Sequence, residues 1–254
     1  MPKPPDFKLL GCAECADGKA LGFDFSMAFQ PIVDVGKREV FAYEALARGT
    51  GGEPAGTVFE HVNEDNYYRF DQTSRVKAIR LASQLDIPSY VSINFMPNAV
   101  YRPELCIRTT LAAAAEYNFP PNRIIFEFNE REEVTDAGHV LNIVAHYQEL
   151  DFKIAIDDFG AGFAGLNLLA DIHPNFVKLD MALIRGIENS HTRQVIVASM
   201  VAMCRELGVV PICEGIETEA ETAVLRKLGV ELMQGYLFAK PAFETLPDIF
   251  YPEL

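Results

Sequence analysis

The chain has 254 residues, of which 49% are hydrophobic, and its 22 basic and 36 acidic side chains give a formal net charge of −14. This acidic balance excludes a passive electrostatic grip on polymeric nucleic acid, which needs a basic face. The length and a mean hydropathy of +0.06 fit a globular protein with a sizeable core, and no apolar run approaches the ~20 residues of a membrane helix.

The first 25 residues are rich in proline, glycine and charge, and we expect a partly ordered lead-in (1–25) to one folded domain at 26–254. They lack the long apolar core of a signal peptide. Cys12 and Cys15 have the spacing of zinc and redox sites, but no second pair follows nearby, so a lead-in segment is favoured over a metal site. The five scattered cysteines favour free thiols in a reducing cytoplasm over a disulfide framework.

The folded pattern begins with two strand-like runs at 26–33 and 39–44, separated by a turn at 34–37. We expect these runs to form a hairpin. A glycine-rich loop at 49–56 follows. Residues 57–85 then place apolar side chains at helical spacing with charges between them, which predicts a helical segment.

From residue 90 onward a strand-then-helix unit repeats. Strands are expected at 90–94, 123–127, 153–157, 175–178, 209–214 and 230–234, with helices between them at 104–117, 135–150, 166–170, 190–207 and 218–228. This alternation, at about 30 residues per unit, predicts a parallel α/β protein. Seven or eight strands in this length fit a closed (β/α)8 barrel better than an open sheet, and no Gly-x-Gly-x-x-Gly turn follows the first strand.

Polar side chains end these strands. The run KIAIDDFG at 153–160 closes with two adjacent carboxylates, Asp157 and Asp158, for which a turn or helix cap is an equally good interpretation when the motif stands alone. In a barrel, however, the carboxyl ends of the strands converge on one mouth. The polar residues expected there are Glu44, Asn94, Glu127, Asp157, Asp158, Lys178, Glu214 and Gln234. So many polar strand ends indicate a functional site.

Carboxylates that face one cavity repel one another unless cations lie between them. Oxygen ligands from Asp, Glu and Asn select hard divalent ions such as Mg²⁺ or Mn²⁺. Two ions that share one aspartate suit phosphodiester cleavage by an acidified water. Lys178 can orient that water and Arg48 can hold a phosphate oxygen, although an exposed ion pair with Glu44 is the alternative for Arg48. No histidine occupies a strand end, so a His-based triad is not expected.

Taken together, these motifs resemble the EAL domain family of cyclic-di-GMP phosphodiesterases over residues 27–245. The matching segments are FQPIVD at 29–34, YEALAR at 43–48, SIN at 92–94, EFNE at 127–130, IDDFGAG at 156–162, VKLD at 177–180, EGIE at 214–217 and QGYLFAKP at 234–241. The resemblance implies a TIM-like (β/α)8 barrel with one early strand antiparallel, and a homodimer. It also implies hydrolysis of one phosphodiester bond of cyclic di-GMP to linear pGpG, with two divalent cations (Mg²⁺ or Mn²⁺) and a metal-bound water as nucleophile.

Carried over by position, the resemblance assigns a role to each site residue. One metal would be held by Glu44, Asn94, Glu127 and Asp157. The second would be held by Asp157, Asp158 and Glu214, with Asp157 bridging. Lys178 matches the group that contacts the nucleophilic water. Positions that match substrate contacts are Gln30, Leu46, Arg48 and Gln234. Glu130 matches a residue that steadies the loop after Asp158, and Glu217 matches a supporting acid.

Two positions depart from the family, which usually has threonine where this chain has Asn129 and Ala161. Both lie beside the expected metals rather than among their ligands. They therefore affect the expected link between the loop after Asp158 and dimerisation, and not the ligand set. Every ligand position carries the expected residue type, which favours an enzyme over a catalytically silent cyclic-di-GMP receptor that signals to a partner. A barrel lyase or isomerase with carboxylates on Mg²⁺ is disfavoured, because an Asp-Asp pair on one strand suits two metals better than one.

Overall fold

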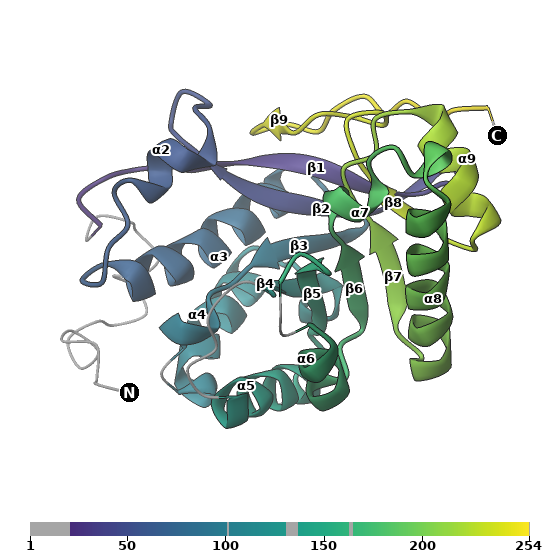
Figure 1. Cartoon of the computed structure of the whole chain (residues 1–254). Helices are drawn as coiled ribbons and strands as arrows, with labels where there is room; N and C mark the ends of the chain where they lie inside the picture. Colours follow the sequence, from purple (N-terminus) through teal and green to yellow (C-terminus); the bar gives the residue numbers. More distant parts are fainter. Residues whose placement is uncertain (1–20, 101, 131–136, 163–164, 254) are drawn as a thin grey trace.

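The computed structural model describes residues 21–253 apart from 101, 131–136 and 163–164, and in this part of the chain the strands close into a barrel (Figure 1). The strand order β2-β3-β4-β5-β6-β7-β8-β1 returns to β2, because β1 pairs with both β8 and β2. Neighbours from β2 to β8 are parallel, whereas β1 is antiparallel to both of its neighbours. The predicted TIM-like (β/α)8 barrel with one early antiparallel strand is therefore confirmed.

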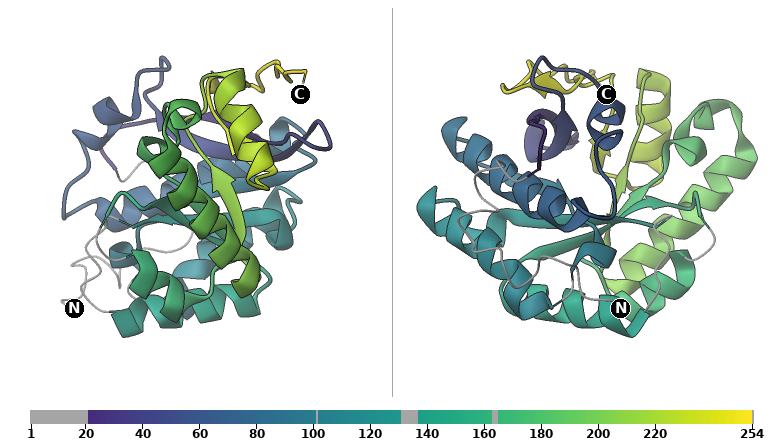
Figure 2. Two further views of the ribbon diagram at one scale, coloured as in Figure 1. Left: turned by 45° about the vertical axis from the view of Figure 1, so that its right-hand side comes forward. Right: turned by 90° about the vertical axis from the view of Figure 1, so that its left-hand side faces the viewer.

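The strands are β1 (Ser26–Asp34), β2 (Glu39–Arg48), β3 (Tyr90–Asn94), β4 (Ile124–Asn129), β5 (Lys153–Phe159), β6 (Phe176–Leu179), β7 (Val210–Cys213) and β8 (Leu232–Gln234), with a short β9 (Ala242–Phe243) beside β1. The helices are α2 (Ala55–Phe59), α3 (Tyr67–Gln84), α4 (Pro103–Glu116), α5 (Ala137–Glu149), α6 (Gly165–Ile172), α7 (Met181–Ile184), α8 (His191–Leu207) and α9 (Glu219–Lys227), and short 3-10 turns lie at η1 (Pro97–Ala99), η2 (Pro121–Arg123) and η3 (Ile187–Asn189). Figure 2 shows the longer helices as an outer layer around the strands.

Two apolar layers hold the barrel together. A small cluster of inward-facing residues consists of Ile32, Ala42, Ile125, Ala155, Phe176, Ile212 and Leu232. Successive residues of a strand point to opposite faces, so their neighbours, such as Phe126 and Ile154, belong to a larger core shared with the helices. Burial on both faces explains why these strands read as nearly continuous apolar runs. The inner cluster forms the floor beneath the barrel mouth.

The structure corrects two sequence predictions. Strand β2 continues to Arg48, so Glu44 lies inside the strand rather than at its end. The predicted helical segment at 57–85 is two helices, α2 and α3, with a turn between them. In that turn the side chain of Asn66 accepts the N–H of Asn63, whose own side chain accepts the N–H of Asp65. Such side-chain bonds compete with the helical ladder and break it.

The predicted lead-in falls mostly outside the described residues, as do Cys12 and Cys15, so the boundary at residue 26 stays a prediction. Within the described part, Leu21 and Phe25 are buried in the main core. The ring of Phe25 lies 5.0 Å from that of Phe70 on α3. Among the helices that the structure describes, none is both long and apolar enough to cross a membrane.

A buried ion pair joins helix α3 to the segment after β3. Arg75 Nη2 lies 2.7 Å from Asp71 Oδ2, with both side chains fully buried, and Arg75 Nη1 donates to the hydroxyl of Tyr147 at 3.0 Å. Asp71 Oδ1 accepts the backbone N–H of Met96 at 3.0 Å. The Arg75 guanidinium carbon also lies 5.0 Å from the ring centroid of Phe126, a cation–π distance. The pair thus ties α3, α5 and β4 to the turn that follows β3.

We predict that Arg75→Ala lowers the free energy of unfolding by about 3–5 kcal/mol, because the substitution leaves the Asp71 carboxylate buried without its counter-charge. Equilibrium urea denaturation measures the change. The matched control is Arg108→Ala on the exposed side of α4, which we expect within about 0.5 kcal/mol of the unsubstituted protein. Equal stability of the two variants would contradict the role given to this pair.

Candidate active site

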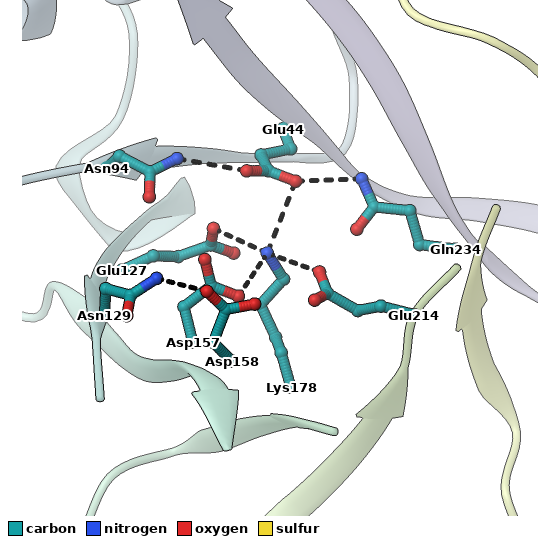
Figure 3. Close-up of polar contacts among 9 residues, drawn as sticks. All are labelled: Glu44, Asn94, Glu127, Asn129, Asp157, Asp158, Lys178, Glu214 and Gln234. Carbon is teal, nitrogen blue, oxygen red and sulfur yellow. Dashed lines mark hydrogen bonds and ion pairs between the residues drawn. The ribbon is translucent and has the colours of Figure 1, made fainter. Parts of the chain in front are cut away.

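The polar residues that the sequence predicted at strand ends gather at the barrel mouth because of strand alternation. Each lies two positions from a residue of the inner face, and two positions along a strand restore the same face. These inner-face pairs are Ala42 and Glu44, Ser92 and Asn94, Ile125 and Glu127, Ala155 and Asp157, Phe176 and Lys178, Ile212 and Glu214, and Leu232 and Gln234. Figure 3 shows the polar members converging on one centre.

Lys178 occupies the middle of this centre. Its Nζ lies 2.7 Å from Glu214 Oε1, 2.9 Å from Glu127 Oε2, 3.0 Å from Asp157 Oδ1 and 3.3 Å from Glu44 Oε2. The lysine side chain is only 1% exposed, so bulk water screens these interactions poorly. One ammonium group therefore links carboxylates from β2, β4 and β5 and from Glu214, the residue that follows β7 (Figure 3).

Two amides fix the Glu44 carboxylate. Asn94 Nδ2 donates to Glu44 Oε1 at 3.0 Å and Gln234 Nε2 donates to Glu44 Oε2 at 2.9 Å. Gln30 is the β1 residue paired with Glu44 across the antiparallel ladder, and its Nε2 donates to the carbonyl oxygen of Ala239 at 3.3 Å. Both oxygens of Glu44 are thus held by amides from β3 and β8, which orients the carboxylate toward the centre.

Strand β5 is irregular where it carries its two aspartates. Adjacent residues of a regular strand point to opposite faces, which would turn Asp157 and Asp158 apart. Instead, the pairing of β5 with β6 shifts register between Ile156 and Phe159, and Asp158 has a φ of 53°. Aspartate tolerates this left-handed conformation because its short side chain can hydrogen-bond locally. The irregularity turns Asp158 toward the mouth beside Asp157 (Figure 3).

Glu130 holds the backbone of the loop after β5. Its Oε2 accepts the N–H of Gly160 at 2.7 Å and of Gly162 at 3.3 Å, and its Oε1 accepts the N–H of Gly165 at 2.7 Å. The side chain is buried, and a Cβ at Gly165 would come within 2.8 Å of its Oε1. These bonds agree with the supporting position that the sequence analysis gave to Glu130.

The carboxylates form two groups that share Asp157. Glu44, Glu127 and Asp157 offer oxygens within 4.8 Å of one another, as do Asp157, Asp158 and Glu214. Ionised carboxylate oxygens are acceptors only and are the ligands that hard divalent cations prefer. The donor set therefore fits two such cations, and the grouping matches the two ligand sets expected from the sequence.

Burial raises the pKa of Glu127 to about 8, with further repulsion from the carboxylates of Glu44 and Asp157 acting against the attraction of Lys178. Burial also raises the pKa of Glu214 well above its ordinary value, again with repulsion from Asp157 and Glu44. The pKa of Asp157 is raised by the same cause. Without a cation, burial and mutual repulsion therefore favour the protonated forms of these three acids.

Glu44 and Lys178 shift toward their charged forms. Burial opposes the charge of Glu44, but the Lys178 ammonium and the hydrogen bonds from Gln234 and Asn94 lower the pKa of this carboxyl below its usual value. Burial also opposes the charge of Lys178, yet the surrounding carboxylates, with Asp157 the strongest, raise its pKa well above the ordinary value. A charged lysine thus takes part of the role that cations would have.

Two cavities open beside the centre, and Glu44 lines both. The larger, of about 530 Å³, is lined by Gln30, Glu44, Asp158, Asp180, Met181, Ala182, Arg185, Glu214, Gly215, Glu217, Gln234, Gly235 and Tyr236. The smaller, of about 370 Å³ and more apolar, is lined by Met27, Glu44, Ala45, Leu46, Ala47, Ala55, Phe59, Phe70, Asp71, Ser74, Ile93, Asn94, Phe95, Met96, Asn129 and Asp157. The expected substrate residues Gln30 and Gln234 lie in the first cavity and Leu46 in the second.

Two expected residues stand away from the centre. Arg48, which lines neither cavity, donates through Nη1 to the carbonyl oxygen of Ala47 at 2.7 Å. Glu217 lies at the rim of the larger cavity, where its Oε1 pairs with Arg185 Nη2 at 2.5 Å. The sequence analysis missed Arg185 and Asp71 as cavity residues. They come from a loop and a helix, so the strand-end pattern carries no signal for them.

The barrel and its mouth define a class of protein: a TIM-like (β/α)8 barrel with a buried carboxylate centre suited to divalent cations. Within that class, the chain belongs to the EAL domain family, whose family model matches residues 19–241.

Among curated proteins, the chain is 30% identical over 227 residues to the blue light- and temperature-regulated antirepressor BluF of Escherichia coli, covering 89% of this chain and 56% of BluF. It is 28% identical over 162 residues to the cyclic di-GMP phosphodiesterase RocR of Pseudomonas aeruginosa, covering 64% of this chain and 41% of RocR. The match thus spans only about half the length of these relatives.

Solved structures with the same fold include a standalone versatile EAL protein from Vibrio cholerae O395 in its c-di-GMP bound form. It is 55% identical with a TM-score of 0.87, covering 90% of this chain and 96% of that protein. The manganese and cyclic di-GMP complex of Klebsiella pneumoniae BlrP1 is 33% identical with a TM-score of 0.84, covering 89% of this chain and 58% of BlrP1.

We predict that divalent-cation binding releases protons, because Glu127, with a pKa of about 8, must be deprotonated to act as a ligand. The apparent affinity for Mn²⁺ should fall as the pH drops below about 8, by up to about tenfold per pH unit for each proton displaced. Titration calorimetry in two buffers of different ionisation enthalpy counts the protons released.

In Glu127→Gln the side chain has no proton to release, so binding should be weaker and its pH dependence smaller. An affinity of the unsubstituted protein that stays constant across this pH range would refute the coupling.

Proposed function

We propose that this chain hydrolyses one phosphodiester bond of cyclic di-GMP, giving linear pGpG, with two divalent cations (Mg²⁺ or Mn²⁺) in the carboxylate centre. The observation that carries the proposal is the pair of carboxylate groups that share Asp157 and lie beside two cavities meeting at Glu44. The names of the relatives support it, since RocR is a cyclic di-GMP phosphodiesterase and the Vibrio cholerae structure is a c-di-GMP bound form.

The first cation would be held by Glu44, Asn94, Glu127 and Asp157, and the second by Asp157, Asp158 and Glu214. When bound, the cations supply the positive charge that acidifies a water molecule and offsets the charge of the phosphodiester. The neutral amide of Asn94 adds an oxygen ligand without adding charge, while its Nδ2 keeps Glu44 oriented. The chain thus contributes an arrangement that is complete before substrate enters.

Lys178 contacts members of both carboxylate groups. Once cations bind these carboxylates, the ammonium N–H groups can donate to the attacking water and to a phosphate oxygen, which stabilises the negative charge that develops there. The water oxygen forms a new bond to phosphorus, and the bond from phosphorus to the 3′ oxygen breaks. The water gives up one proton as it bonds to phosphorus and the leaving oxygen takes one up, so the two halves of one water molecule are added across the broken bond and the product is linear.

The two cavities suit a ligand with two ends. One end would enter the larger, more polar cavity beside Gln30 and Gln234, and the other the smaller, more apolar cavity beside Leu46. Arg48, at the end of β2, would reach a phosphate oxygen after leaving the carbonyl of Ala47. A homodimer stays a prediction from the family resemblance, and a cytoplasmic location stays a prediction from the scattered cysteines.

A catalytically silent receptor for cyclic di-GMP is the second candidate. The name of BluF, an antirepressor, favours it, because such a protein acts through a partner. Against it stands the centre itself, since both carboxylate groups are complete and close enough to hold cations.

We predict that the purified chain converts cyclic di-GMP to pGpG with Mn²⁺ or Mg²⁺ and that a chelator stops the reaction. Glu44→Ala should lower kcat at least about 100-fold, because it removes a proposed ligand that touches both cavities. Chromatography of the nucleotide products measures the rate. Glu206→Ala, on the exposed side of α8, is the matched control and should keep full activity. Tight binding without turnover, whichever cation is supplied, would replace the enzyme proposal with the receptor.

A further inference from the structure

Asn129, the last residue of β4, contacts the carboxylate centre directly. Its Nδ2 donates a hydrogen bond to Asp158 Oδ2, and its backbone pairs with Asp157 across the parallel ladder (Figure 3). The side chain also lines the smaller cavity beside Glu44. Asn129 thus lies against the aspartate pair without belonging to either carboxylate group.

The Asp158 side chain is carried by an irregular turn. Its φ of 53° is left-handed, a conformation that aspartate adopts when its short side chain hydrogen-bonds locally. A carboxylate on such a turn can swing away from the mouth unless something holds it. The amide of Asn129 occupies one oxygen of Asp158 and leaves the other open to a cation.

The Asn129 amide is uncharged, and this matters for cation binding as much as its position does. A lysine or arginine in this place would neutralise Asp158 and compete with a cation. An aspartate would repel it, because like charges this close disfavour ionisation. Asparagine orients the carboxylate and preserves its negative charge. Ligands to metals are commonly held by hydrogen bonds of this kind.

Glu130, the residue after Asn129, has a different role. It accepts backbone N–H groups at Gly160, Gly162 and Gly165 and so holds the backbone at these three glycines. Asn129 instead bonds the side chain of Asp158. Asn129 therefore holds a side chain, whereas Glu130 holds backbone. A substitution at Asn129 can change the orientation of the Asp158 carboxylate without removing the hydrogen bonds that Glu130 accepts.

We propose that Asn129 is a positioning residue that orients the Asp158 carboxylate and thereby sets the affinity of the group Asp157, Asp158 and Glu214 for a divalent cation. The proposal rests on the proposed function, because it takes that group to be a cation site. It assigns Asn129 no contact with the reacting atoms.

Mn²⁺ binding, measured by calorimetry and by the paramagnetic resonance signal of free Mn²⁺, tests the proposal. For Asn129→Ala we expect one of two Mn²⁺ sites to weaken by about 10–100-fold, and the other to keep its affinity. Asn129→Asp should weaken the same site at least as much, since it loses the donor and adds repulsion. Asn167→Ala, an exposed asparagine on α6, is the matched control and should bind as the unsubstituted protein does.

The metal dependence of turnover provides a second readout. A positioning role predicts that Asn129→Ala recovers most of its kcat at saturating Mn²⁺, whereas general damage to the fold would not be rescued in this way. Thermal unfolding without cations should change little in this variant. Unchanged affinity at both sites in Asn129→Ala, or fewer than two Mn²⁺ sites in the unsubstituted protein, would overturn the inference. Two Mn²⁺ sites with the predicted weakening, but no cyclic-di-GMP turnover, would overturn the proposed function alone.

Discussion

The central constraint on the active site is the repulsion among the carboxylates that the barrel brings together at one mouth. A single ammonium, that of Lys178, lies within 3.3 Å of oxygens from four of them. It keeps the centre assembled without fully neutralising it, so a deficit of positive charge remains. That deficit attracts cations. The raised pKa values of Glu127 and Glu214 have the same origin, because burial and the neighbouring carboxylates favour the protonated, uncharged acids.

The irregular end of β5 is the reason that the carboxylates form two groups instead of one. A regular strand would present one aspartate to the mouth and bury the other among the helices. The register shift before Phe159 and the left-handed Asp158 make both available, and Asp157 then belongs to both groups. At this distortion Asn129, the last residue of β4, bonds the Asp158 side chain, and Glu130, the next residue, accepts the backbone N–H of Gly160.

Much of this was predictable from sequence, because strand alternation and parallel topology are periodic. They placed Glu127, Asp157 and Lys178 at one mouth and identified the antiparallel hairpin at the start. The failures occur where side chains override periodicity. The asparagines between α2 and α3 break a helical pattern through local hydrogen bonds. Arg185 and Asp71 reach the cavities from a loop and a helix, and only the folded arrangement brings them there. The contact of Asn129 with Asp158 likewise arises only when β4 and β5 pair in the folded barrel.

The hydrogen bond from Gln234 to Glu44 joins residues separated by 190 positions in the chain. It forms only when β8 and β2 both pack against β1, which is the step that closes the barrel. Contacts of such long range are slow to form, because the loop between them must first lose its entropy. The centre is therefore complete only when the barrel has closed. Activity that depends on this centre would therefore indicate that the whole barrel has folded.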